Sequence, residues 1–162
     1  MRSALRSLRA FGLAAGIALA AAGHAAHAQQ APHDPQTQML PDARGAVPWS
    51  LLTRTSIQKV DGRLGPKFPD ALRPLHGQTV KLQGYIIPLE PGLKHRRLLL
   101  SAWSPSCPFC LTAGPEAMVE VQMRRAVAHS LDAIVLQGRL QLLDNDPAGL
   151  FYRLVDAEPA AL

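Results

Sequence analysis

The sequence predicts a mainly β protein, built as a small five-stranded OB-like barrel or a strongly coiled antiparallel sheet, with one or two short helices. From His76 onward, apolar and polar side chains alternate with a period of two in short runs separated by turn residues. This pattern is typical of half-buried strands. The tripeptide Leu-Gln-Gly occurs inside two of these runs, at residues 82–84 and 136–138. A glycine in mid-strand usually marks a bulge or a tight bend, as the closure of a small barrel requires.

The expected elements follow in order from local patterns. Pro48 suits a first helical position, and Trp49 and Leu52 would then share one face of a short helix. A further helical turn is expected over residues 68–72, stopped by Pro74. The five expected strands cover a run after Gly77 that ends at Pro88, an apolar run at 97–103, and residues 118–123, 131–143 and 150–155. Because the connections between these strands are short, the pattern favours a barrel or a single coiled sheet.

The first 28 residues have the features of a secretory signal peptide. Three arginines within the first nine residues precede a short apolar run, and Ala26-His27-Ala28 supplies a cleavage site of small residues. We therefore predict cleavage after Ala28 and a periplasmic location. The apolar run is too short for a membrane span, so no integral membrane segment is expected in the mature chain. Residues 29–47 are predicted to be a mobile lead-in and residues 48–162 a single β-rich domain.

The charge of the mature chain is nearly balanced. Three of the 17 basic residues lie in the predicted signal and all 12 acidic residues follow it, which leaves a net charge of +2. The densest basic run is Lys94-His95-Arg96-Arg97, which we interpret as the solvated start of a strand. A nucleic-acid partner needs a larger concentration of basic residues, so none is expected.

Both cysteines lie in one Cys-x-x-Cys motif, Cys107-Pro-Phe-Cys110, which follows an apolar run and Trp103. In a thioredoxin-type site, Cys107 would be the nucleophile and Cys110 would resolve the mixed disulfide. Such a site also needs a long helix after the second cysteine, and Gly114-Pro115 leaves room for barely one turn. Thiol–disulfide exchange is therefore kept only as an alternative.

Two other interpretations of the cysteine pair remain open. In an oxidising compartment, Cys107 and Cys110 could close a disulfide that fixes the loop. They could also form half of a zinc site, completed by histidines near strand ends. The histidines of the mature chain are His33, His76, His95 and His129. We name Cys107, Cys110, His95 and His129 as the candidate metal ligands.

Enzymes of other classes are not expected. The sequence contains no phosphate-binding loop and no metalloprotease or serine hydrolase motif. Glu116 and Glu120 would lie on or near a strand, and we interpret them as solvent-side charges rather than as an acid–base pair.

The segment Gly84-Tyr-Ile-Ile-Pro-Leu89, together with Cys-Pro-Phe-Cys, resembles an uncharacterised family of small exported bacterial proteins, a domain of unknown function. The resemblance covers the chain from Trp49 to the end. It implies a non-enzymatic accessory or binding protein with a protein partner in the periplasm. Relatives of this kind are often encoded beside transporter components, and sometimes beside proteins suspected of handling zinc. We expect Tyr85 to pack on the outer face of its strand and Pro88 to end that strand. A non-catalytic interaction module with a structural disulfide is a further alternative.

Overall fold

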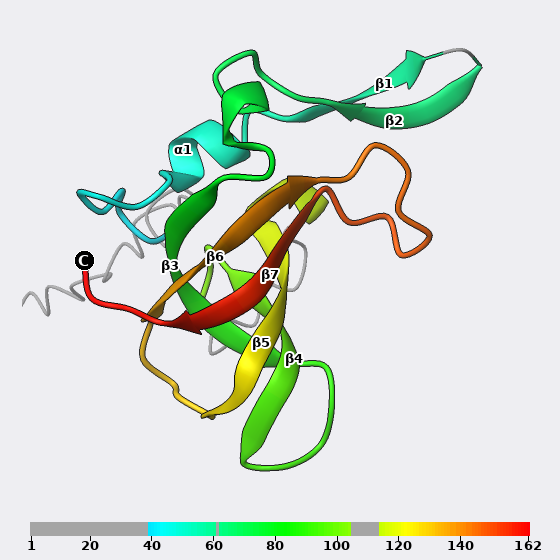
Figure 1. Cartoon of the computed structure of the whole chain (residues 1–162). Helices are drawn as coiled ribbons and strands as arrows, with labels where there is room; N and C mark the ends of the chain where they lie inside the picture. The colour runs from blue at the N-terminus through cyan, green and yellow to red at the C-terminus, as the bar shows by residue number, and fades with distance from the viewer. Residues whose placement is uncertain (1–38, 61, 105–113) are drawn as a thin grey trace, which may run out of the picture. The chain divides into compact units, whose positions relative to one another are not determined.

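A closed barrel of five strands forms the core of the fold (Figure 1). The computed structural model describes residues 39–60, 62–104 and 114–162. The predicted signal peptide, the lead-in up to residue 38 and both cysteines lie outside these residues. The barrel strands are β3 (Thr79–Pro88), β4 (Lys94–Ser101), β5 (Met118–Ala128), β6 (Ile134–Leu142) and β7 (Tyr152–Pro159). The predicted mainly β fold class is confirmed.

The barrel strands are arranged in the order β3-β4-β5-β7-β6, and β6 pairs back with β3 to close the cylinder. Every neighbouring pair is antiparallel except β5 with β7, which run parallel. The parallel pair arises because β6 crosses over to β3, and β7 then returns between β5 and β6. Of the two predicted alternatives, the structure shows the OB-like barrel rather than an open antiparallel sheet.

Two glycines allow the strands to approach closely where the barrel bends. At Gly84, β3 changes neighbours, since Gly84 pairs with Ile134 of β6 whereas Tyr85 pairs with Ser101 of β4. A Cβ atom at Gly84 would lie 2.5 Å from the Leu100 side chain. At Gly138, where the β6–β7 register shifts, a Cβ would lie 2.9 Å from a backbone oxygen of β7. The two Leu-Gln-Gly segments therefore mark barrel bends, as the sequence predicts.

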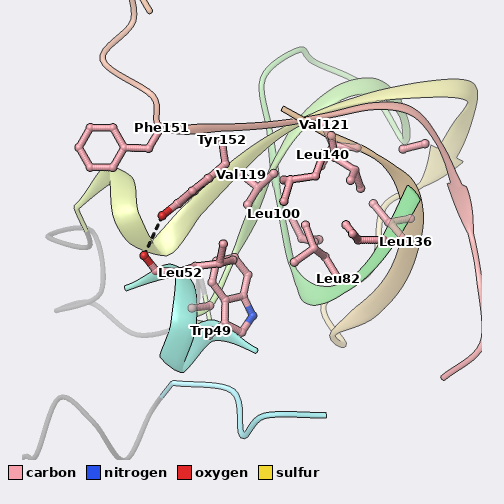
Figure 2. Close-up of a cluster of buried hydrophobic side chains, with 14 of the residues drawn as sticks. Trp49, Leu52, Leu82, Leu100, Val119, Val121, Leu136, Leu140, Phe151 and Tyr152 are labelled. Carbon is pink, nitrogen blue, oxygen red and sulfur yellow. Dashed lines mark hydrogen bonds between the residues drawn. The ribbon is translucent and has the colours of Figure 1, made fainter. Parts of the chain in front are cut away.

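The barrel interior is filled by apolar side chains that alternate inward along the strands (Figure 2). The fully buried leucine and isoleucine side chains of the strands are Leu82, Ile86, Leu98, Leu100, Leu136, Leu140 and Leu154. The short helix α1 (Trp49–Leu52) covers one end of this core with both of its predicted apolar residues, Trp49 and Leu52. The Trp49 indole Nε1 donates a hydrogen bond to the Gln83 carbonyl oxygen at 2.7 Å, so the helix is held by a polar as well as an apolar contact.

Besides α1, two 3-10 helices and a two-stranded hairpin of the described residues lie outside the barrel. The 3-10 helices are η2 (Arg73–Leu75) and η4 (Pro115–Ala117). The helical turn predicted over residues 68–72 is not formed, since residues 70–72 are a turn; the 3-10 helix follows at 73–75 and contains Pro74, which is tolerated in the first turn of a helix. Strands β1 (Ser56–Val60) and β2 (Arg63–Lys67) form a separate antiparallel hairpin. Local patterns did not predict this hairpin, because none of its side chains that the structure describes is buried.

Residues 39–47, which belong to the predicted lead-in, contact the barrel. Met39 forms an isolated β-bridge with Trp103. The Leu40 amide donates to the Ala102 carbonyl at 2.9 Å, and the Val47 amide donates to the Lys81 carbonyl at 2.8 Å. This part of the predicted lead-in is therefore held by backbone hydrogen bonds.

Within the part of the chain that the structure describes, no helix is long and apolar enough to cross a membrane.

Candidate metal site at the histidine end of the barrel

Two of the predicted ligands, His95 and His129, lie side by side at the end of the barrel where β4 begins and β5 ends. His95 belongs to β4 and pairs with Val127, while His129 directly follows β5. The His129 amide donates to the Leu93 carbonyl at 2.9 Å, which joins the two strand ends. The imidazole centroids are 5.6 Å apart and the rings meet edge to face. We call this end of the barrel, with the β3–β4 and β5–β6 loops, the histidine end.

His95 is buried without a hydrogen-bond partner. Its relative exposure is 1 %, and within the described residues neither Nδ1 nor Nε2 has a partner. A buried polar atom without a partner is unfavourable by about 1–3 kcal/mol, and native structures contain few of them. The neighbouring His129 is exposed. One buried and one exposed imidazole thus lie together, and imidazole nitrogen is the commonest protein ligand for transition metals.

Glu90 holds the loop beside this histidine pair. Its Oε1 accepts hydrogen bonds from the backbone amides of Arg96 at 2.7 Å and Arg97 at 3.3 Å. These two bonds, with smaller contributions from the charges of His95 and Arg97, hold the pKa of Glu90 below its ordinary value. The histidine pair therefore has an ionised carboxylate nearby. No group of three or more His, Cys, Asp or Glu side chains among the described residues is arranged to hold a metal ion.

Cys107 and Cys110 lie outside the described residues, but the residues that anchor their segment do not. Ser101 pairs with Met118, and the Ala102 amide donates to the Ala117 carbonyl at 3.1 Å. These anchors lie at the other end of the β4–β5 pair, about 20 Å from His95 at the ordinary rise of a strand. His95 lies near the start of β4, whereas Ser101 is the last residue of that strand. The set of all four residues around one metal ion stays an untested prediction.

The described residues around the cysteine segment also bear on the redox alternative. The segment connects β4 to β5, and it is followed by η4 and then directly by β5. A thioredoxin-type site places the motif between a strand and a long helix of an α/β fold. The barrel therefore does not provide the usual framework for that chemistry.

Local patterns missed a buried ion-pair cluster on the outer face of β4, β5 and β7. Glu120 has a relative exposure of 4 %, and its carboxylate accepts hydrogen bonds from Arg97 at 3.1 Å and Arg153 at 2.7 Å. Arg153 also donates to Asp146 at 3.0 Å. Burial would raise the pKa of Glu120, but the bonds from Arg153 and Arg97 hold it below its ordinary value. The prediction of a solvent-side charge at Glu120 is wrong, because cross-strand neighbours cover it.

The remaining residues that the sequence indicated do not join the histidine pair. Tyr85 is half-buried and pairs with Ser101, and Pro88 pairs with Leu98 at the exposed end of β3. His76 accepts a hydrogen bond at Nδ1 from the Leu142 amide at 3.1 Å. It therefore has a structural partner away from the histidine end.

Comparisons with known proteins give little further information about function. No family model matches the chain, and no curated protein matches it. A solved structure of a DUF3299 family protein from Pseudomonas aeruginosa PAO1 is similar at 18 % identity and a TM-score of 0.42. The match covers 60 % of this chain and 68 % of that one. That neighbour belongs to a domain-of-unknown-function family.

Proposed function

We propose that this chain is an exported accessory protein that binds a divalent transition metal ion, zinc foremost, through His95 and His129. One observation carries the proposal: the buried imidazole of His95, which has no hydrogen-bond partner among the described residues, lies against the exposed imidazole of His129. A metal ion coordinated by His95 would satisfy one of its nitrogens, and zinc accepts imidazole in this role.

A site with two protein ligands suits reversible binding and transfer of a zinc ion better than permanent binding of a structural zinc ion. Structural zinc sites have four protein ligands and no open position. The pair described here would leave positions for water or for ligands from a second protein. Because His129 is exposed, a partner could reach the ion from that side. This chemistry supports an accessory role beside a metal-handling or transport partner.

The proposal predicts that zinc affinity depends on His129. Replacing the exposed His129→Gln should weaken zinc binding by the mature chain roughly tenfold or more, since loss of even an outer-shell partner has effects of this size. Affinity is measured by competition with a chromophoric chelator. The matched control is His76→Gln. His76 is also exposed, but its Nδ1 accepts a hydrogen bond from the Leu142 amide away from the histidine end, so its replacement should leave zinc affinity unchanged.

A Cys107→Ser, Cys110→Ser double variant separates the two possible sites. If the double variant loses zinc while His129→Gln keeps it, the ion is bound by the cysteine motif and the histidine site is wrong. Retention of zinc by both variants at wild-type affinity would also contradict the proposal. The intact mass of the wild-type protein under native conditions then shows whether the two thiols are free or joined.

A further inference from the structure

The histidine end exposes leucines on two neighbouring loops. Leu93, in the β3–β4 loop, has a relative exposure of 85 %, and Leu131, in the β5–β6 loop, has 78 %. The hydrogen bond from the His129 amide to the Leu93 carbonyl brings these two loops together, and Figure 1 shows both at the same end of the barrel. Leu89, also in the β3–β4 loop, is 46 % exposed. The three leucines thus project from one end of the molecule.

Exposed basic side chains lie on the ends of β4 and β5 that adjoin these leucines. Lys94 and Arg96 follow Leu93 at the start of β4, and both are exposed. On β5 the register shifts between Gln122 and Val127, so that the exposed Arg124 and Arg125 lie in the irregular stretch opposite Arg96. The acidic groups of these loops are Glu90, which is bonded to backbone amides, and the exposed Asp132, while Asp156 and Glu158 of β7 line a surface pocket with Arg124. The end of the β4–β5 pair therefore carries a positive excess.

We propose that the histidine end docks onto a membrane surface rich in anionic phospholipid, with Leu93 and Leu131 entering the interface. The binding of a protein surface to a membrane strengthens with the apolar area that it buries in the interface and with the attraction of its basic groups to anionic lipids. Both are present here within one pair of strand ends. The long stems of Lys94 and Arg96 can lie along the apolar boundary while their charges reach the phosphates.

The arrangement fits a lipid surface better than a protein surface. Protein interfaces are typically centred on aromatic or arginine anchors that fill pockets, within a continuous apolar core. Here the apolar residues are single leucines on loop tips, with exposures of 78–85 % for the two most projecting ones. Separate exposed leucines with basic side chains nearby suit a lipid bilayer surface, because each leucine can insert between lipids independently of the others. This inference does not depend on metal binding, although both features lie at the same end.

The test is co-sedimentation of the mature protein with vesicles in the presence of a metal chelator, so that the result is independent of the zinc proposal. Vesicles of phosphatidylcholine mixed with phosphatidylglycerol should bind the protein, and vesicles of phosphatidylcholine alone should not. The Leu93→Ser, Leu131→Ser double variant should bind the anionic vesicles roughly tenfold more weakly, since each lost buried CH₂ weakens partitioning. Lys94→Gln, Arg96→Gln should bind more weakly and show a smaller dependence on salt.

The hairpin β1–β2 offers a matched control. Ile57 and Leu64 are exposed apolar residues at 57 % and 78 %, and they lie away from the histidine end (Figure 1). The Ile57→Ser, Leu64→Ser variant removes comparable apolar surface and should bind vesicles as the wild type does. The proposal is overturned if anionic vesicles do not bind the protein, if neutral vesicles bind it equally, or if the control variant loses binding as much as Leu93→Ser, Leu131→Ser. Circular dichroism of each variant checks that the barrel remains folded.

Discussion

At the scale of single residues, Tyr152 joins the barrel to the segment that covers its end. Its ring is fully buried, and its hydroxyl donates to the Leu52 carbonyl at 2.7 Å while bonding the Thr55 hydroxyl (Figure 2). Burial raises the pKa of Tyr152 to about 12, against an ordinary value of 10.0. The neutral phenol is therefore favoured in the folded state.

This shift predicts an alkaline loss of stability. A group whose folded-state pKa is raised stabilises the fold fully below its unfolded pKa, and this contribution disappears as pH rises through the folded value. The free energy of unfolding should thus fall by roughly 2–3 kcal/mol between pH 10 and pH 12 through Tyr152. Urea denaturation at several pH values measures it. Tyr152→Phe should be less stable at neutral pH but lack this part of the alkaline loss. An equal loss in the phenylalanine variant would contradict the assignment.

Glu120 is the second residue whose environment could not be inferred from its neighbours in sequence. We expect Glu120→Gln to lower the free energy of unfolding by about 1–3 kcal/mol, because two charged hydrogen bonds to Arg97 and Arg153 are weakened in a buried site. The lowered pKa of Glu120 means that its contribution is present above the unfolded pKa and is lost as pH falls through the folded value. The wild type should lose this contribution in acid, and the glutamine variant should not.

The exposed pair of Arg139 and Asp156 provides the control for Glu120. These two side chains are 52 % and 56 % exposed, and such pairs contribute at most about 1 kcal/mol. Asp156 has a φ of 55°, which asparagine also adopts readily. Asp156→Asn should therefore change stability little. If it costs as much as Glu120→Gln, burial does not explain the effect at Glu120.

At the scale of secondary-structure elements, the close approach of β3 to β4 requires Gly84, and the close approach of β6 to β7 requires Gly138. An added methyl group at either position would overlap a neighbouring strand, with predicted contacts of 2.5–2.9 Å. We expect Gly84→Ala and Gly138→Ala each to lower the free energy of unfolding by about 1–3 kcal/mol or more. The control is Gly65→Ala on β2, where the nearest atom would be 3.5 Å away. Thermal unfolding measures all three, and equal melting temperatures would show that these bends tolerate a side chain.

Strand pairing also decides which functional groups meet. The hydrogen bond between the His129 amide and the Leu93 carbonyl and the pairing of His95 with Val127 place both imidazoles at one end of β4–β5. The same pairing anchors the cysteine segment at the opposite end through Ser101 and Met118. Whether the two cysteines join these histidines around one ion stays untested, since both cysteines lie outside the described residues.

At the scale of the whole molecule, the two ends of the barrel differ in chemistry. One end is covered by α1, with Trp49 and Leu52 buried, and Ser101 of β4 pairs with Met118 of β5 at this end. The other end is uncovered by helices among the described residues and carries the histidine pair, projecting leucines and basic side chains. The proposed metal site and the proposed lipid-facing surface both belong to this second end. A metal ion bound there would be held close to the membrane surface.

The sequence by itself determined the inward and outward positions along the strands. Val80, Leu82 and Ile86 are buried as the period of two predicts, and Gly84 and Gly138 lie at barrel bends. These properties are local, because a strand's alternation and a glycine's lack of a Cβ act over a few residues. They were sufficient to predict a small mainly β fold, either a barrel or a coiled sheet, and a short helix that buries Trp49 and Leu52, whereas the pairing of β6 with β3 decided for the closed barrel.

Only the tertiary structure decided which distant residues become neighbours. The parallel pairing of β5 with β7 places Arg153 beside Glu120, 33 residues apart in sequence, and so buries a charge that looked exposed. The placement of His95 and Ser101 toward opposite ends of the β4–β5 pair also follows from strand direction and order. Alternation along one strand carries no information about the register or partner of another. The histidine pair and the ion-pair cluster therefore exist only because the closed barrel fixes both.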